Sequence, residues 1–449
     1  MTARDEGTGC AQGEGALDAL VVSLARDGER TTALAARVPL APSLAGGALE
    51  RIVVRHTLPS GASWRHRHVV KWLLPEHGWL GAATHDTRIR EAQLARSGLL
   101  DTLPRSLATP TRAVRIEGDP AAPEVAVLLM DDVSPYLVRH AIGGPAGRLT
   151  GELLALLDRL AQLHARFWCD PRLREPALGL VTPRDALLLA APQTLAARIA
   201  AGDENPYLPL ALRGWEAFFA LAAPDDAAAL EAVLRDPDPV LRAIAALPWT
   251  LTHGDVWAPN LGWLPPGIHR TPLRERETPT GGARHAPLRI LLSAPSAKLS
   301  GLRALRLPSA SASAIPSPGR CRGEPWLARP GGEDSRLLLL DWALAAAAPA
   351  TYDPLWLCGS THALDPVAVL AAYRPRLEHH LRARGIALAP AVWRDLAHAG
   401  YLRTVLTCGE AFGRAAAEAP AGAARRRAEA RVRWWARRAA RAAGALVGQ

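Results

Sequence analysis

The chain has 449 residues, 49% of them hydrophobic, which allows two or three compact units with a sizeable core. Asp341 and Pro349 interrupt the longest apolar candidates, so no uncharged stretch of about 18 residues remains and we do not expect a membrane span. The polar, acid-containing N-terminus does not resemble a secretory signal, and the five cysteines form no C-x-x-C pair, so we expect a reducing cytoplasm without disulfides or a zinc cage.

The net charge of +10 is unevenly distributed along the chain. Residues 267–336 and 425–441 each carry a net charge of +7, which leaves −4 for the remainder. Because the basic charge belongs to two segments, we do not expect nucleic acid as a partner of the main body. Only Lys71 and Lys298 among the 53 basic residues are lysines, so each of them needs an explanation.

The first third of the chain favours a small sheet with one helix. After a helical start, two β-branched stretches ending near residues 58 and 74 flank the turn sequence PSGAS, which predicts a hairpin around residues 59–63 with Lys71 on its second strand. A short helix is expected within residues 85–100, ending near Gly98. The apolar run EVAVLLMDDVS, residues 124–134, predicts a buried strand.

From Leu149 onward the pattern is mainly helical. Leucines at helical spacing behind a Thr150 cap predict an amphipathic helix. The Arg-rich tail predicts a docked last helix with a solvated face in preference to a nucleic-acid arm, because its apolar residues share one face: Val432, Trp435, Ala436, Ala439 and Ala443.

Two short strands interrupt these helices, at residues 260–264 and 336–342, and we expect them to pair. The segment between them, residues 267–336, is rich in Pro, Ser, Gly and Arg and has no sustained apolar period. It is predicted to be a disordered insertion in a hairpin, with Lys298 as a solvated charge.

The sequence HGDVWAPN, residues 253–260, carries polar residues at a spacing that neither a helix nor a strand explains. Asp255 and Asn260 have the spacing of a kinase catalytic loop, in which the aspartate accepts the substrate hydroxyl proton and the asparagine binds magnesium. Asp341 follows the apolar run LLLL, where a carboxylate is costly unless it is paired or bound to a cation. We therefore predict Asp341 as the second metal ligand.

A nucleotide-binding half is predicted upstream. Lys71 is placed as the phosphate-binding lysine, and Glu91 on the following helix is its expected ion-pair partner. A compact ammonium fits between two phosphates where a planar guanidinium fits poorly, which explains a lysine in an arginine-rich chain. Gly46 and Gly47, before the first strand, could let backbone N–H groups approach the phosphates, and they equally fit an ordinary turn.

These residues resemble the aminoglycoside phosphotransferase and choline kinase-like family. The resemblance rests on THGDVWAPN, LLLLDWALAAAAPATYDPLWL and LAQLHARFW, and it extends from about residue 45 to at least residue 357 with the insertion as an interruption. Three features depart from the family pattern: Ala343 stands where many kinases have glycine, a full G-x-G-x-x-G is absent, and the long insertion lies next to the site.

The resemblance implies an α+β, bilobal protein-kinase-like fold. Residues 1–132 would form a small antiparallel β-sheet N-lobe that binds the nucleotide, and residues 133–449 a mainly α-helical C-lobe for catalysis and substrate. The implied cofactors are ATP and Mg²⁺. The implied roles are Asp255 as catalytic aspartate, Asn260 and Asp341 as metal ligands, and Lys71 with Glu91 as the nucleotide-orienting pair.

The stretch LLMDDV resembles the hinge strand between the lobes of this family. By that resemblance Met130 would line the adenine pocket, while backbone groups of Asp131 and Val133 would bond the base.

Three further polar residues near these motifs have structural interpretations. We expect His253 to brace the loop by hydrogen bonding, because Asp255 already fills the role of base. Asp353 is expected to be a cap or a brace in preference to a ligand. His164 lies near an apolar helical face and is expected to be a packed core histidine.

The predicted function is that of a small-molecule kinase, which transfers the ATP γ-phosphoryl group to a hydroxyl. A protein substrate is not expected, because no activation segment with a closing A-P-E follows Asp341. One alternative is an ATP-binding pseudokinase scaffold, which slow turnover despite tight Mg·ATP binding would indicate. Another is a nucleic-acid-associated protein acting through the basic insertion and tail, which a steep salt dependence of binding would reveal. The body charge of −4 fits a cationic aminoglycoside, a neutral sugar or an amino alcohol alike.

Overall fold

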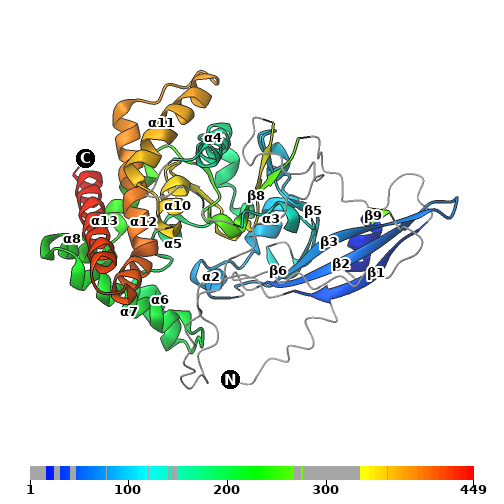
Figure 1. The fold of residues 1–449 in the computed structure, drawn as a ribbon, viewed down its shortest axis with the longest axis horizontal. Coiled ribbons are helices and arrows are strands. Elements are labelled where there is room, and N and C mark those ends of the chain that lie inside the picture. Colours follow the sequence, from blue (N-terminus) through cyan, green and yellow to red (C-terminus); the bar gives the residue numbers. More distant parts are fainter. Residues whose placement is uncertain are drawn as a thin grey trace, which may run out of the picture.

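An antiparallel sheet and a large group of helices occupy different parts of the molecule, so the protein is of the α+β class (Figure 1). The computed structural model describes residues 17–24, 31–40, 47–76, 78–119, 121–139, 142, 149–266, 275–276, 334–361 and 363–448. Most of the predicted insertion, and with it Lys298, lies outside these residues.

The sheet is built from strands in the order β1-β2-β3-β6-β5, with every neighbouring pair antiparallel. Its strands are β1 (Thr31–Pro39), β2 (Ala48–Thr57), β3 (Ser63–Leu73), β5 (Thr111–Asp119) and β6 (Ala122–Asp131), and the short β9 (Glu275–Arg276) pairs with the start of β3. The predicted hairpin is confirmed, because β2 and β3 pair in register from Thr57 opposite Ser63 to Ala48 opposite Trp72.

One expectation about this sheet is wrong. The sequence predicts Gly46 and Gly47 before the first strand, but β1 precedes them and runs antiparallel to β2. Gly47 therefore lies in the connection between two paired strands, while Gly46 is outside the described residues. The sequence of β1, TTALAARVP, alternates only weakly between apolar and polar residues, which explains why the pattern did not predict a strand.

The two faces of the sheet are covered differently. Ile52, Val54 and Val70 on one face pack with Leu17 and Leu20 from a helical segment at residues 17–23. The opposite face packs against the predicted short helix, α3 (Arg90–Arg96), which follows α2 (Gly78–Ala83). Burying the apolar side chains on both faces supplies the main stabilisation of the sheet, at about 1.5–3 kcal/mol for each fully buried large side chain.

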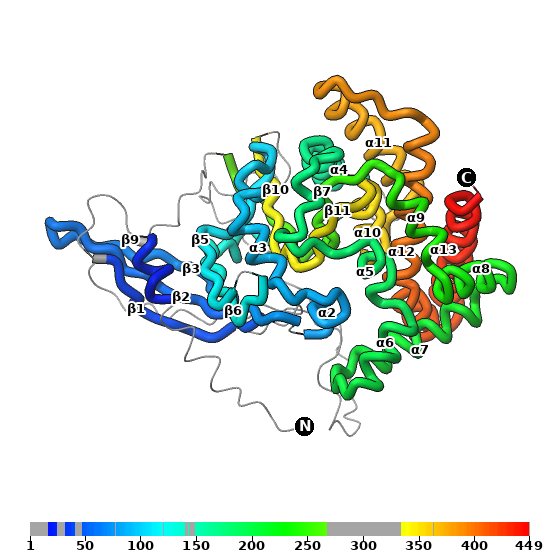
Figure 2. Tube along the Cα trace, turned by 180° about the vertical axis from the view of Figure 1, so that it is seen from behind, coloured from blue at the N-terminus to red at the C-terminus, as the bar shows by residue number. Residues whose placement is uncertain are grey.

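The remaining chain is mainly helical, and Figure 2 shows these helices from behind, gathered beyond the sheet. They are α4 (Gly151–Arg166), α5 (Pro183–Leu188), α6 (Pro192–Ala200), α7 (Tyr207–Leu221), α8 (Pro224–Arg235), α9 (Asp238–Ala245), α10 (Tyr352–Thr361), α11 (Pro366–Arg382), α12 (Pro390–Glu418) and α13 (Ala423–Val447). The predicted cap of α4 is confirmed, since the Thr150 side chain accepts a hydrogen bond from Leu153 N. No described helix is long and apolar enough to cross a bilayer.

Short strands and 3₁₀ turns lie between these helices and form two further small sheets. The strands β4 (Leu107–Ala108), β10 (Arg336–Leu339) and β8 (Leu261–Leu264) form a small sheet, and β7 (Thr250–Thr252) pairs with β11 (Ala346–Ala348). The predicted pairing across the insertion is confirmed, because β8 and β10 are antiparallel neighbours. The 3₁₀ turns are η1 (Leu99–Thr102), η2 (Ser134–Tyr136), η4 (Pro171–Arg174), η5 (Pro176–Leu178), η6 (Ala258–Asn260) and η7 (Trp342–Leu344).

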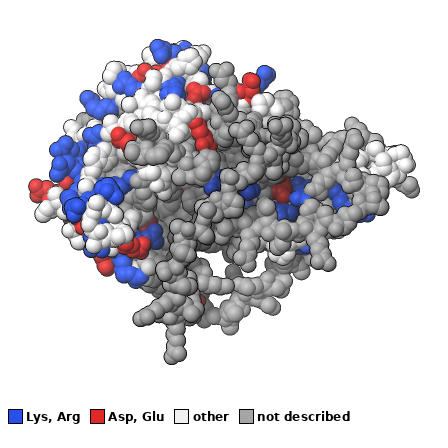
Figure 3. All heavy atoms as spheres, viewed as in Figure 1, with Lys and Arg blue, Asp and Glu red and all other residues white. Residues whose placement is uncertain are grey.

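The last helix docks as the sequence predicts. The apolar residues of α13 that were assigned to one face are all buried in the main core: Val432, Trp435, Ala436, Ala439 and Ala443. Its arginines other than Arg431 are exposed, and on the face drawn in Figure 3 basic side chains gather over the helical part of the molecule.

Candidate active site

The motif HGDVWAPN forms a loop between β7 and β8 that turns back on itself. Its last residues form η6, and Asn260 Nδ2 donates to Asp255 Oδ2 at 2.9 Å and to the Asp255 backbone carbonyl at 3.1 Å. The five-residue spacing therefore brings the aspartate and the asparagine into contact, as the loop prediction requires. Asn260 is buried, whereas Asp255 keeps partial exposure.

Asp353, at the start of α10, holds this loop from within the core. Its Oδ2 accepts hydrogen bonds from His253 N at 2.9 Å and from His164 Nε2 at 3.0 Å, while Oδ1 accepts from Gly254 N at 2.9 Å. Burial alone would raise the pKa of Asp353, but the hydrogen bond and charge of His164, together with His253, hold it below the usual value. The brace predicted for Asp353 is confirmed.

The two histidines near Asp353 differ in how well the sequence predicted them. His253 Nε2 bonds the Leu340 carbonyl at 2.7 Å, so its predicted bracing role is confirmed. His164 is fully buried as expected, but it is not an ordinary apolar core residue, because its ring nitrogens contact Asp353 and the Tyr373 hydroxyl. A buried imidazole needs such partners, and they come from residues far along the chain.

Gly254 is the position in the loop where only glycine fits. Its φ is 81°, and an added Cβ would lie 2.1 Å from the Leu344 backbone oxygen. A side chain here would therefore push the loop away from η7, the turn that follows Asp341.

Asp341 lies two residues after the end of β10, and its backbone conformation is unusual. It has φ 60° and ψ 73°, in the left-handed region that asparagine and aspartate tolerate better than other non-glycine residues. Such a conformation costs of order 1 kcal/mol or more and is concentrated at functional sites.

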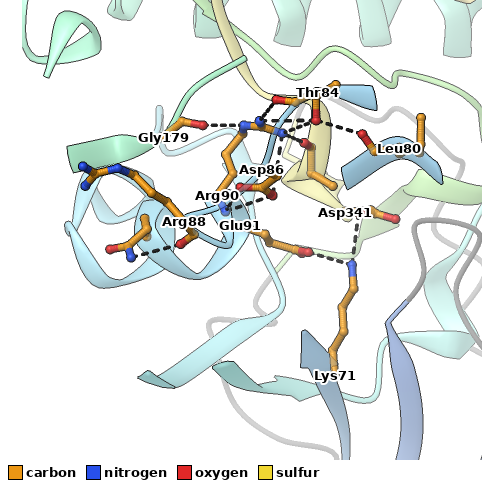
Figure 4. A network of polar contacts seen from close by, with 11 residues as sticks. Lys71, Leu80, Thr84, Asp86, Arg88, Arg90, Glu91, Gly179 and Asp341 are labelled. Carbon is orange, nitrogen blue, oxygen red and sulfur yellow. Dashed lines mark hydrogen bonds and ion pairs between the residues drawn. The ribbon is translucent and has the colours of Figure 1, made fainter. Parts of the chain in front are cut away.

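Lys71 joins the sheet to this turn (Figure 4). Its Nζ lies 2.6 Å from Glu91 Oε2, which is the ion pair that the sequence predicted, and 3.0 Å from Asp341 Oδ1, a contact that it did not predict. Burial would lower the pKa of Lys71, but the carboxylates of Asp341 and Glu91 raise it above the usual value. The lysine is therefore held charged between two carboxylates from distant parts of the chain.

The pKa of Asp255 is raised within the site. Burial, followed by the charge of Asp341, raises the pKa of Asp255 to about 7, while Arg403 and Asn260 oppose the shift. Two acidic groups in one partly enclosed site repel, and a bound cation would relieve that repulsion.

Arg90 is a site residue that the sequence did not single out. Its Nε donates to the Gly179 carbonyl at 2.6 Å, and its Nη1 donates to the Ala343 carbonyl, two residues after Asp341 (Figure 4). The helix that carries Glu91 is thereby tied to the Asp341 turn. In a chain where almost every basic residue is arginine, no composition signal separates this one from the rest.

The remaining predicted residues border the same region. Gly47, Glu91 and Ala343 line one pocket. Met130 packs on the α3 face of the sheet. Asp131 ends β6, and its N–H donates to the Pro110 carbonyl. Val133 follows two residues later and is buried beside the small sheet.

A magnesium ion fits the donors that this site offers. The described residues contain no cluster of three or more His, Cys, Asp or Glu that could hold a metal by themselves. Mg²⁺ does not need one, because it commonly binds through one or two carboxylates together with waters and the phosphates of its nucleotide. Asp341 supplies a carboxylate and Asn260 an amide oxygen within the same small region.

Comparisons with known proteins find little. No protein-family model and no curated protein match the chain. One solved structure that is similar is described as a proposed aminoglycoside phosphotransferase from Ralstonia eutropha JMP134, with 14% sequence identity and a TM-score of 0.39 over 96% of this chain and 98% of that one. A similarity this remote does not assign the chain to a family.

Proposed function

We propose that this protein is a magnesium-dependent small-molecule kinase, which transfers the γ-phosphoryl group of ATP to a hydroxyl of its substrate. The proposal includes a two-lobed, kinase-like arrangement, with residues 1–132 as the nucleotide-binding lobe and residues 133–449 as the catalytic lobe.

One observation carries the proposal. Lys71 of β3 contacts Glu91 of α3 and Asp341 after β10, and Asp341 lies close enough to Asp255 to raise its pKa. Four ionisable residues spread over 270 positions thus come together, and they match the set that phosphoryl transfer uses: a lysine for phosphates, a glutamate that orients it, a carboxylate for metal and a carboxylate for proton transfer.

The roles of the nucleotide-binding residues follow from their places. The ammonium of Lys71 would bind nucleotide phosphates, with Glu91 keeping it oriented, and Gly46 and Gly47 would let the β1–β2 connection approach them. Met130 would line the adenine site, with the Asp131 carbonyl and the Val133 N–H bonding the base.

Asp255 would act on the acceptor. Asp341 and Asn260 would hold Mg²⁺, which when bound neutralises charge on the transferred phosphoryl group. The Asp255 carboxylate accepts the proton of the acceptor hydroxyl as that oxygen bonds to the γ-phosphorus, and the bond from this phosphorus to the β–γ bridging oxygen breaks to release ADP. Asn260 orients the carboxylate through its hydrogen bond to Oδ2.

The short connection after Asp341 supports a small acceptor. Only residues 342–351 separate Asp341 from α10, and most of them are buried in β11 and its turns. A protein kinase needs a longer exposed segment here to bind its polypeptide substrate, so a small hydroxylated molecule is favoured.

A screen of ATP consumption tests the proposal directly. The full chain is incubated with Mg·ATP and a library of sugars, amino alcohols, hydroxy acids and aminoglycosides, and ADP release is followed by a coupled assay. We expect at least one acceptor class to raise ADP release in a magnesium-dependent manner and to yield a phosphomonoester by mass spectrometry. Tight Mg·ATP binding without turnover against any class would instead support the pseudokinase alternative.

A further inference from the structure

Arg403, on α12, lies beneath the HGDVWAPN loop and has no role in the chemistry described above. Its side chain is almost fully buried, with 2% of the residue exposed. Nη2 donates to the Gly254 carbonyl at 3.0 Å. The guanidinium carbon lies 4.4 Å from the centroid of the Trp356 ring and 5.4 Å from that of Tyr352, both on α10, so two aromatic rings fix its orientation.

The backbone of Gly254 is therefore held on both sides of its Cα. Its N–H donates to Asp353 on α10, and its carbonyl accepts from Arg403 on α12. The next residue is Asp255. Two helices thus determine together where the backbone of the proposed base lies, and each does so through one hydrogen bond to the same glycine.

Stability does not account for a charge at this position. Nε and Nη1 of Arg403 are buried and have no hydrogen-bond partner among the described residues. The carboxylates of Asp353 and Asp255 favour the charged guanidinium, but the opposing effect of burial on its pKa is larger. Replacing buried charged groups by apolar side chains of similar volume is often neutral or stabilising, so a buried arginine with two unpaired N–H groups is weak evidence for a role in stability. What an apolar side chain cannot do is bind the Gly254 carbonyl.

We propose that Arg403 is a positioning residue for phosphoryl transfer, which holds the Gly254 peptide in place and through it Asp255. The inference rests on the proposed function for its catalytic part, whereas the effect on the loop itself is independent of it. Removing the guanidinium should loosen the loop and lower kcat without changing the binding of the nucleotide, because Lys71 and Glu91 lie on other elements.

The chain offers a matched control in Arg431 of α13. Its Nη2 donates to the Cys358 carbonyl of α10 at 2.8 Å, and its guanidinium carbon lies 5.6 Å from the Phe412 ring centroid. Arg431 therefore makes the same two kinds of contact as Arg403, a hydrogen bond to a backbone carbonyl and a stack on an aromatic ring, but it makes them to α10 and α12 and not to the loop.

The test compares Arg403→Met, Arg403→Lys and Arg431→Met with the parent full-length chain. Hydrogen–deuterium exchange of residues 253–256 should become about 10-fold faster in Arg403→Met, because the hydrogen bond that restrains this segment is lost. With an acceptor from the screen, kcat should fall by about 10²-fold, as small displacements of reacting groups do, while the KM for ATP changes less than about 2-fold. Arg403→Lys should recover part of kcat, and Arg431→Met should alter neither readout.

The outcomes separate the two proposals. Unchanged loop exchange in Arg403→Met, or an equal effect of Arg431→Met, overturns the role of Arg403. If the parent turns over no acceptor, the proposed function fails, and exchange alone then decides whether Arg403 positions the loop. If Arg403→Met does not fold, Arg403→Lys is decisive: an ammonium does not reproduce the stacked guanidinium geometry, so parental kcat and exchange in that variant overturn the proposal.

Discussion

The ammonium of Lys71 lies 2.6 Å from the carboxylate of Glu91, and neither side chain is more than 5% exposed. Removing one partner of a buried ion pair leaves the other charge without compensation. We therefore predict that Lys71→Met lowers the free energy of unfolding by about 3 kcal/mol, measured by urea denaturation at pH 7. Glu91 and Asp341 would then repel each other with no cation between them.

A matched surface pair provides the control. Arg433 and Glu429 lie 3.9 Å apart on α13, with side chains 48% and 29% exposed. Arg433→Met should change the free energy of unfolding by less than about 0.5 kcal/mol, because exposed pairs contribute little. Equal decreases in the free energy of unfolding in Lys71→Met and Arg433→Met would contradict the stabilisation assigned to the buried Lys71–Glu91 pair.

The Asp353 brace predicts a specific dependence of stability on pH. Its folded-state pKa is lowered, so its contribution is present above the unfolded value of about 3.9 and is lost as the pH falls through the folded value. Asp353→Asn should therefore be less stable than the parent at pH 7, by about 2 kcal/mol or more, because an amide has one accepting oxygen and both oxygens of Asp353 accept hydrogen bonds. The difference between parent and variant should narrow below pH 4.

Asp365 offers a control for the same substitution. It caps α11 through a hydrogen bond from Val367 N, and asparagine caps a helix as well as aspartate does. Asp365→Asn should therefore leave the free energy of unfolding at pH 7 nearly unchanged. The parent and Asp353→Asn should differ less in free energy of unfolding at pH 3 than at pH 7. A difference that stays constant between these pH values would contradict the contribution assigned to the ionised Asp353 carboxylate.

The two proposed metal ligands, Asp341 and Asn260, should contribute unequally to the binding of Mg²⁺. Asp341→Asn removes the charge that offsets Mg²⁺ but keeps a residue that tolerates the φ of 60°, whereas Asn260→Ala removes a neutral ligand. Calorimetric titration should show a larger loss of magnesium-dependent ATP affinity in Asp341→Asn. If both variants bind Mg·ATP with the affinity of the parent, Asp341 and Asn260 are not the magnesium ligands.

Deletion of the predicted insertion tests the domain organisation. Leu264 of β8 faces Arg336 of β10 in register, so a short Gly/Asn turn from Pro266 to Ser335 can close the hairpin. We expect this deletion to fold with a Tm close to that of the parent, since each doubling of loop length costs only about 0.6 kcal/mol. Expression as aggregate only, or melting far below the parent, would reveal a segment that the fold needs.

The parts of the structure that the sequence predicts are those with a local cause. The hairpin follows from its turn residues, α4 from its cap at Thr150, and the contact of Asp255 with Asn260 from their spacing in a loop. Lys71 was recognisable because lysine is rare in this chain. In each case the signal lies within a few neighbouring residues.

The parts that it did not predict depend on distant contacts. β1 has little alternation of its own and is a strand because β2 pairs with it. Arg90 and Arg403 look like any other arginine until the fold brings the Ala343 and Gly254 carbonyls to them, 253 and 149 positions away. The hydrogen bonds of His164 likewise come from helices that follow it by about 190 positions or more.

Turnover by Asp255→Asn, set against its binding of Mg·ATP, tests the central claim most directly. With an acceptor found by the screen, we expect the parent to form a phosphomonoester and the variant to do so about 10²-fold more slowly, because a positioned base contributes on that order. The variant should bind Mg·ATP as the parent does, since Lys71, Asn260 and Asp341 remain. Near-parental turnover in Asp255→Asn would contradict the assignment of Asp255 as the base.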